Sequence, residues 1–160
     1  MASNAEKALA VFQKHLGEEE GVGAWHTVDQ AQINAFADAT LDHQFIHIDP
    51  EKAAKLSPYK VTIAHGFLTL SLVVHLGASI SPIDPEAYQG IAMGVNYGLD
   101  KVRFPAPVPV DSKVRARRKL VAAELKAPNT IQIKQEVAIE VEGGKKPACV
   151  AETLTRLVYS

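Results

Sequence analysis

The sequence lacks the features of several protein classes. Cys149 is its only cysteine, which excludes an intrachain disulfide framework and argues against a thiolate zinc cluster. No apolar run approaches the ~20 residues that span a membrane. The first stretch, MASNAEKALAVFQKHLGEEE, is interrupted by charges, so we expect no secretory signal. A single thiol suits a reducing compartment, and we therefore expect a cytoplasmic protein.

The sequence also lacks an excess of charge of either sign. The formal net charge is −1, so nothing global points to a nucleic-acid or membrane partner. With 47% hydrophobic and 22% charged residues, the composition is that of a globular protein. A chain of 160 residues can build one core without staples, and we expect a single domain over residues 1–160.

The first half of the chain carries helical patterns. Ser3-Asn4 can cap a helix that runs to about Leu16, where Gly17 stops it. A short strand is expected at 25–28. Asp29 then resembles the cap of a second helix, and Pro50 suits the first turn of a third, short one.

From Gly66 onward, FLTLSLVVHLGASI is apolar almost all round. This pattern predicts a fully buried helix that ends between Gly77 and Ser81, before Pro82.

The second half is rich in Val and Ile, and several segments alternate in polarity. We expect strands near 90–104, 111–125, 130–142 and 147–158. Helices followed by long strands predict an α+β fold with an antiparallel sheet. The apolar helix at 66 should lie in the concave face of that sheet.

Residues 40–50, TLDHQFIHIDP, concentrate titratable groups. His43 and His47 are four residues apart, as zinc ligands on one helix face would be. However, Pro50 closes the stretch, which we expect to be a loop, so the spacing loses its meaning and we expect no metal site. Asp49 before Pro50 is best explained as a helix cap.

Asp42 and His47 remain as a possible acid/base pair. A loop that doubles back can bring a carboxylate and an imidazole to one water molecule, and histidine exchanges protons near neutral pH. Phe45 and Ile46 would bury the loop. Composition alone favours the simpler explanation, that both are ordinary surface polar groups.

Gly66 lies where the buried helix begins. Free backbone N–H groups at that point could receive a carbonyl oxygen that becomes negative during a reaction. Alternatively, the sole role of Gly66 could be to let the chain turn and pack closely.

Taken together, these stretches resemble the MaoC-like family, the R-specific enoyl-CoA hydratases. The resemblance rests on the loop from Asp42 to Pro50, on Ala64-His65-Gly66, and on KVRFPAPVPVDSKVR at 101–115. It covers most of 24–158, with 1–20 outside it. Gln44 and Phe45 stand where the family has Asn and Pro, a form similar to its NodN-like branch.

The resemblance implies a hot-dog fold, with the sheet wrapped around one long central helix, and a homodimer. It also implies reversible hydration of a trans-2-enoyl-CoA to a (3R)-hydroxyacyl-CoA in fatty acid metabolism. Asp42 would activate the water, His47 would orient it and deliver a proton to C2, and the Gly66 N–H would hold the thioester oxygen. No metal or redox cofactor is needed, because the thioester accepts the electrons.

Neighbouring residues are candidates for substrate contact: Gln44, Phe45, His65 and Phe67. His65 could equally be a satisfied polar group, and Phe67 a core residue. The basic run at 115–119 could meet CoA phosphates or form a solvated strand face, and Cys149 should be a small buried side chain. Two other functions remain open, a hot-dog thioesterase and a non-catalytic module that binds acyl-CoA or acyl-carrier protein.

Overall fold

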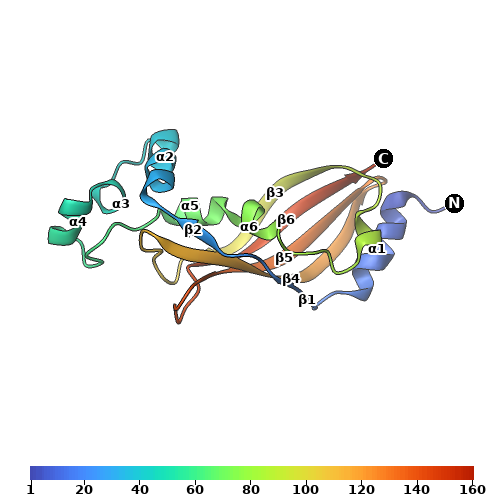
Figure 1. Ribbon diagram of the computed structural model, residues 1–160. Helices are drawn as coiled ribbons and strands as arrows, with labels where there is room; N and C mark the ends of the chain where they lie inside the picture. Colours follow the sequence, from blue (N-terminus) through green and yellow to red (C-terminus); the bar gives the residue numbers. More distant parts are fainter.

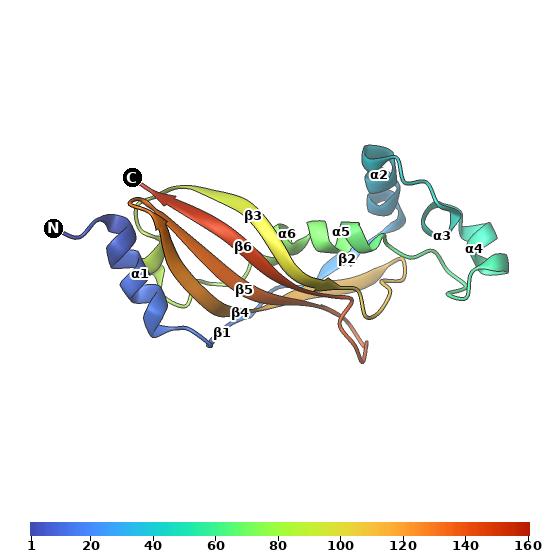
Figure 2. The ribbon, with the colours of Figure 1, turned by 180° about the vertical axis from the view of Figure 1, so that it is seen from behind.

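The computed structural model describes residues 1–160 and contains one antiparallel sheet of six strands. The strand order is β1-β4-β5-β6-β3, with β2 also paired to β4. The sheet curves along its length, and short helices run against its concave face (Figures 1 and 2). The strands are β1 (Glu19–Val22), β2 (His26–Val28), β3 (Ile91–Arg103), β4 (Ser112–Ala127), β5 (Thr130–Val141) and β6 (Cys149–Tyr159).

The helices divide into three groups. At one end of the sheet lies α1, and from the other end α2, α3 and α4 project together (Figure 1). Between these ends, α5 and α6 follow each other along the sheet. Their bounds are α1 (Asn4–Lys14), α2 (Gln30–Thr40), α3 (Phe45–Ile48), α4 (Pro50–Leu56), α5 (Gly66–Ser71) and α6 (Val73–Gly77), with a 3-10 turn, η1, at Pro85–Tyr88.

The expected α+β architecture and its four long strands are confirmed. The helix caps are confirmed as well. Ser3 and Glu6 form a reciprocal capping box at α1, Asp29 accepts a hydrogen bond from the Gln32 N–H at α2, and Asp49 caps α4. The strand β1 was not expected from the sequence, because its residues EEGV carry no alternating apolar pattern.

The expectation of one long, fully buried central helix is wrong in two respects. The segment is divided at Leu72 into α5 and α6. In addition, only one side of it faces the core, where Leu68, Leu72 and Leu76 are buried. Phe67 and Val74 point outward and are 68% and 66% exposed. A wholly apolar helix therefore leaves an apolar face uncovered in the single chain.

Two apolar clusters hold the fold together. The larger joins α5 and α6 to the inner face of β4, β5 and β6, and it includes Ile33 of α2 and the fully buried Ile139. The smaller lies under α1, around Phe12, Leu120 and Ile131. The larger cluster anchors the projecting helices to the sheet, and the stretch of titratable residues lies within that projecting segment.

Candidate active site

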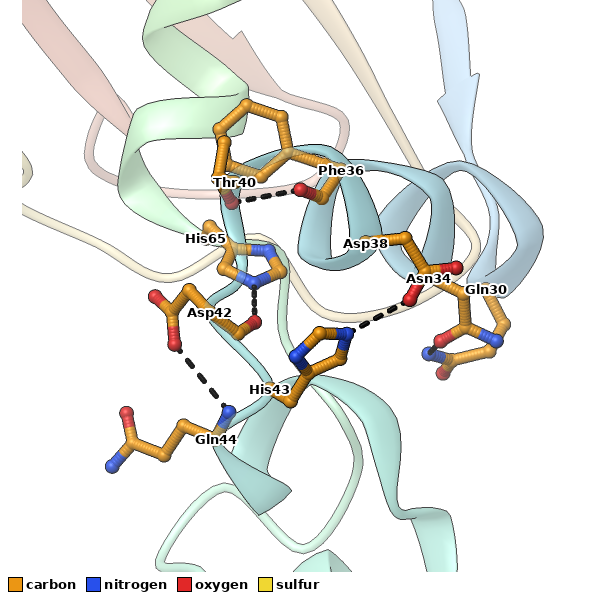
Figure 3. Close-up of polar contacts among 9 residues, drawn as sticks. All are labelled: Gln30, Asn34, Phe36, Asp38, Thr40, Asp42, His43, Gln44 and His65. Carbon is orange, nitrogen blue, oxygen red and sulfur yellow. Dashed lines mark hydrogen bonds and ion pairs between the residues drawn. The ribbon is translucent and has the colours of Figure 1, made fainter.

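Asp42 lies directly after α2, where the chain turns sharply. Leu41 adopts a left-handed conformation, with φ at 62°, and this residue ends the helix. The Asp42 side chain is exposed, and its carboxylate accepts a hydrogen bond of 3.4 Å from the backbone N–H of Gln44 (Figure 3). The carboxylate therefore reaches solvent from a fixed piece of backbone.

His47 lies on α3, so the expectation that residues 40–50 form only a loop is wrong. This one turn of helix buries the imidazole, which is 7% exposed. Its Nδ1 lies 2.7 Å from the backbone carbonyl of Ile63. Because a carbonyl can only accept, Nδ1 carries the hydrogen, and Nε2 of the neutral ring is a free acceptor. The backbone carbonyl of His47 in turn accepts a hydrogen bond of 2.7 Å from Gln30 Nε2.

The surroundings of His47 lower its pKa from the ordinary value of 6.5. Burial has the largest effect, since it disfavours the charged ring. The hydrogen bond to Ile63 acts in the opposite direction. The neighbouring His65 lowers the pKa further, and the Asp42 carboxylate raises it. His47 is consequently held in its neutral form, as a proton acceptor, near neutral pH.

Asp42 and His47 approach each other without touching. A ring nitrogen of His47 and a carboxylate oxygen of Asp42 lie within 4.8 Å, and no hydrogen bond or ion pair joins them. Two hydrogen bonds of about 2.8 Å that meet at a tetrahedral water oxygen span about 4.6 Å. The separation therefore suits one water molecule held by both side chains.

A cavity of about 240 Å³ opens beside His47. It also reaches Gly66, the first residue of α5, whose N–H has no acceptor within the helix. A methyl group at Gly66 would meet the ring of Phe104 at 3.2 Å, so glycine lets this ring pack against the start of α5. The other lining residues are Tyr59, Ile63, Ala64, Thr69, Pro105, Ala106, Pro107, Val108 and Ala148.

Three side chains are close enough to be considered as metal ligands: Asp42, His47 and His65. The two imidazole rings, however, are stacked at 3.8 Å with only 23° between their planes. Metal ligands bind through lone pairs in the ring plane, at about 2.0–2.1 Å for zinc, and nearly parallel rings cannot direct two such lone pairs to one ion. Nδ1 of His47 and Nε2 of His65 are, moreover, already hydrogen bonded to carbonyl groups. His43 and His47, which are four residues apart, do not form a pair of metal ligands either. The His43 ring is hydrogen bonded to Asp38 instead.

Of the seven site residues expected from the sequence, His47 and Gly66 line the cavity. Asp42 and His65 do not line it, but their polar side-chain atoms lie within 4.8 Å of a ring nitrogen of His47. The other three belong to neither group. Gln44 is exposed, Phe45 lies under the ammonium group of Lys52, and Phe67 meets the edge of Phe104 from outside. Substrate contact by these three residues remains a prediction.

Several residues of the site escaped the sequence analysis. The Ile63 carbonyl fixes the orientation of His47, Gln30 holds its backbone, and Phe104 and Thr69 form cavity wall. The Arg-Phe-Pro run at 103–105 could have indicated Phe104, since it lies in a stretch already singled out. A backbone carbonyl leaves no mark in a sequence.

The basic run and the lone thiol remain to be placed, and contact of the basic run with CoA phosphates stays a prediction. Arg115 and Arg117 both bind Glu140, and Arg118 binds Glu20, so these cations are paired within the fold. Cys149 is a buried side chain, as expected, and burial raises the pKa of its thiol to about 11. A thiol of this kind is neutral and unreactive.

A curved antiparallel sheet around two apolar helices brings an imidazole and a glycine N–H to one cavity and holds a carboxylate within 4.8 Å of that imidazole, which is the arrangement of an acid/base enzyme. The model of the family "MaoC like domain" matches residues 11–143, and the chain belongs to this family of hot-dog proteins and is a hydro-lyase.

Curated relatives match along almost the whole chain. A 3-hydroxyacyl-thioester dehydratase Z of Mycobacterium tuberculosis is 49% identical over 152 residues, which are 95% of this chain and 97% of that protein. Nodulation protein N of Rhizobium leguminosarum is 45% identical and covers 96% of this chain and 93% of its own length. These two relatives confirm the expected resemblance to the NodN-like branch.

Solved structures agree on the fold. The (R)-hydratase from A. caviae involved in PHA biosynthesis superimposes with a TM-score of 0.68 at 23% identity, covering 88% of this chain and 94% of that one. None of the helices of the present chain has both the length and the apolar character needed to span a bilayer.

Proposed function

We propose that the protein catalyses the reversible hydration of a trans-2-enoyl-CoA to a (3R)-hydroxyacyl-CoA. The observation that carries this proposal is the separation of Asp42 and His47, which suits one shared water, beside a cavity that Gly66 borders. The names of the relatives, a 3-hydroxyacyl-thioester dehydratase and an (R)-hydratase, support the same chemistry. A water placed at this point could attack C3 of an enoyl thioester in the cavity.

The hydrogen bond from His47 Nδ1 supports the following division of roles between His47 and Asp42. Neutral His47 can only accept at Nε2, so we assign to it the proton that water loses as its oxygen attacks C3. The electron pair of the C2=C3 bond moves to the thioester oxygen. The resulting imidazolium then returns the proton to C2, which completes the addition of water. Asp42, for which the family resemblance implies the role of base, orients the water in this scheme and stabilises the imidazolium.

The Gly66 N–H would donate a hydrogen bond to the thioester oxygen while the negative charge develops there. A donor of this kind contributes about 100- to 1,000-fold to the rate. No residue role in this scheme requires a metal or a redox cofactor, since the conjugated thioester itself takes up the electron pair.

Turnover of crotonyl-CoA tests the proposal. Loss of the conjugated enoyl-thioester absorbance, with no free thiol released, is the expected result, and the product should be the (3R) enantiomer on chiral analysis. Release of free CoA would instead establish a thioesterase. Binding of acyl-CoA with no turnover of any chain length would establish a binding module.

We also propose that the protein works as a homodimer through β3 and the outer face of α5 and α6. The outer edge of β3 pairs with no strand, and β3 exposes the apolar side chains of Met93, Val95, Tyr97 and Leu99. Beside it lie the exposed Val74 and a cleft of about 340 Å³ between helix and strand. Uncovered apolar surface of this extent next to an open sheet edge is typical of an interface.

Light scattering on the purified protein tests the dimer. The wild-type chain should have twice the monomer mass, and Val74→Glu should shift it to the monomer. Leu125→Glu is the matched control. Leu125, like Val74, is an exposed aliphatic side chain, but it lies on β4, away from this face. A monomeric wild type would refute the interface.

The expectation of a cytoplasmic location rests on the lone cysteine and the absence of a signal pattern, and it stays a prediction.

A further inference from the structure

His65 lies at the centre of the site but outside its cavity. Its side chain is 2% exposed, and it is not among the residues that line the cavity. It immediately precedes Gly66, so it belongs to the segment that begins α5. A group so deeply buried cannot meet the substrate directly, and its effect on the reaction must pass through its neighbours.

The ring of His65 contacts both members of the acid/base pair. Its Nε2 lies 3.0 Å from the backbone carbonyl of Asp42, and Figure 3 shows the ring pointing at that oxygen. Because a carbonyl only accepts, Nε2 carries the hydrogen and donates. The face of the same ring stacks on His47, with 3.8 Å between the centroids. Phe36 of α2 packs against it at 5.0 Å.

The remaining nitrogen of His65 has no partner. Nδ1 is buried and makes no hydrogen bond, although an unpaired buried polar atom lowers the stability of the fold. If packing alone mattered at this position, an apolar aromatic ring would fill it without that cost. The Nε2 nitrogen explains why a histidine is needed at this position, because its N–H donates to the Asp42 backbone carbonyl and holds that backbone in place.

We propose that His65 is a positioning residue that sets the separation of Asp42 and His47 and links both to the Gly66 segment. The hydrogen bond fixes the chain at Asp42, and the stacked ring fixes the plane of His47. Both side chains are thereby placed relative to the N–H of the next residue along the chain. This inference rests on the proposed function, since the groups that it positions are those of the hydration reaction.

Two variants separate the two contacts. His65→Phe keeps an aromatic ring for His47 and Phe36 but removes the N–H donor. His65→Gln keeps a donor but removes the ring. We expect kcat to fall about 10- to 100-fold in each, because displacement of about 1 Å costs up to about 100-fold. KM should stay within about twofold of wild type, since His65 does not line the cavity. His15→Gln, next to the end of α1 at the opposite end of the sheet, is the matched control and should match wild type in both constants.

An NMR titration of His47 gives a readout that does not depend on turnover. Asp42 and His65 are the titratable side chains that act on His47. In His65→Phe the burial of His47 is kept while the second imidazole is lost, so the pKa of His47 should rise. It should not change in His15→Gln. If wild type proves inactive, the proposed function fails, but this titration still tests the contact.

The outcomes are distinct. A lower kcat with unchanged KM in both variants, together with the shifted titration, establishes the positioning role. Wild-type kcat and an unchanged His47 titration in His65→Phe would overturn it. If His65→Phe fails to fold, as thermal melting would show, His65→Gln decides in the same way, because its amide can still donate to the Asp42 carbonyl.

Discussion

His47 Nδ1 donates a hydrogen bond of 2.7 Å to the backbone carbonyl of Ile63, and this contact determines which nitrogen faces the chemistry. Metal-free imidazoles used as general bases need one nitrogen held and the other free. Here the carbonyl belongs to the strand-like segment before α5, so the segment that supplies Gly66 also orients the base. Burial keeps that base neutral.

The first prediction concerns the protonation of His47. Since burial lowers its pKa, its NMR titration midpoint should lie below 6.5. Between that midpoint and 6.5 the unfolded chain binds more protons than the folded one, so stability rises with pH across this window and is lost as the pH falls through it. His47→Gln assigns the resonance and should abolish this part of the pH dependence of unfolding. A midpoint above 6.5 would contradict the neutral base.

The second prediction concerns the close contact at Gly66. In Gly66→Ala the new methyl group meets the Phe104 ring at 3.2 Å and forces it, or the start of α5, to move. We expect kcat to fall about 10- to 100-fold, because the N–H and the cavity wall shift together. The double variant Gly66→Ala, Phe104→Leu should recover part of the loss in steady-state kinetics. Full activity in Gly66→Ala alone would mean that the contact between Gly66 and Phe104 is not needed to position the N–H or the cavity wall.

The third prediction concerns the lone thiol. Because the pKa of Cys149 is raised from 9.0 to about 11, its thiolate is about 100-fold scarcer at neutral pH than that of a free cysteine. The folded protein should therefore leave a coloured disulfide reagent unchanged over the time of an assay. One equivalent should react at once in guanidinium chloride. Rapid reaction of the folded protein would show that this end of β6 opens readily.

Much of the fold could be predicted because its signals are local. The caps Ser3, Asp29 and Asp49 act within three residues of themselves, and the four long strands carry their own alternation. The break at Leu72 could not be predicted, since an uninterrupted apolar run shows neither where a helix breaks nor which side stays uncovered. The exposed face of Phe67 and Val74 likewise depends on what lies beside it in space.

The candidate site divides in the same way. Asp42, His47 and Gly66 could be proposed from residue type and spacing, and the structure brings them together. The Ile63 carbonyl, the stacking of His65 and the wall formed by Phe104 depend on how distant segments meet, so no local pattern records them. Gln44 and Phe45 are close to the pair in sequence and Phe67 follows Gly66, but all three lie outside the cavity lining.

The most direct test of the account is the turnover of crotonyl-CoA by wild type, Asp42→Asn and His47→Gln, with free thiol measured in parallel. Wild type should consume the enoyl thioester without releasing thiol. Each variant should keep its fold by circular dichroism and lose about 100-fold or more of the rate, the range for acid/base groups. If either variant retains near-wild-type hydration, that residue does not act in the reaction, and the shared-water mechanism is wrong.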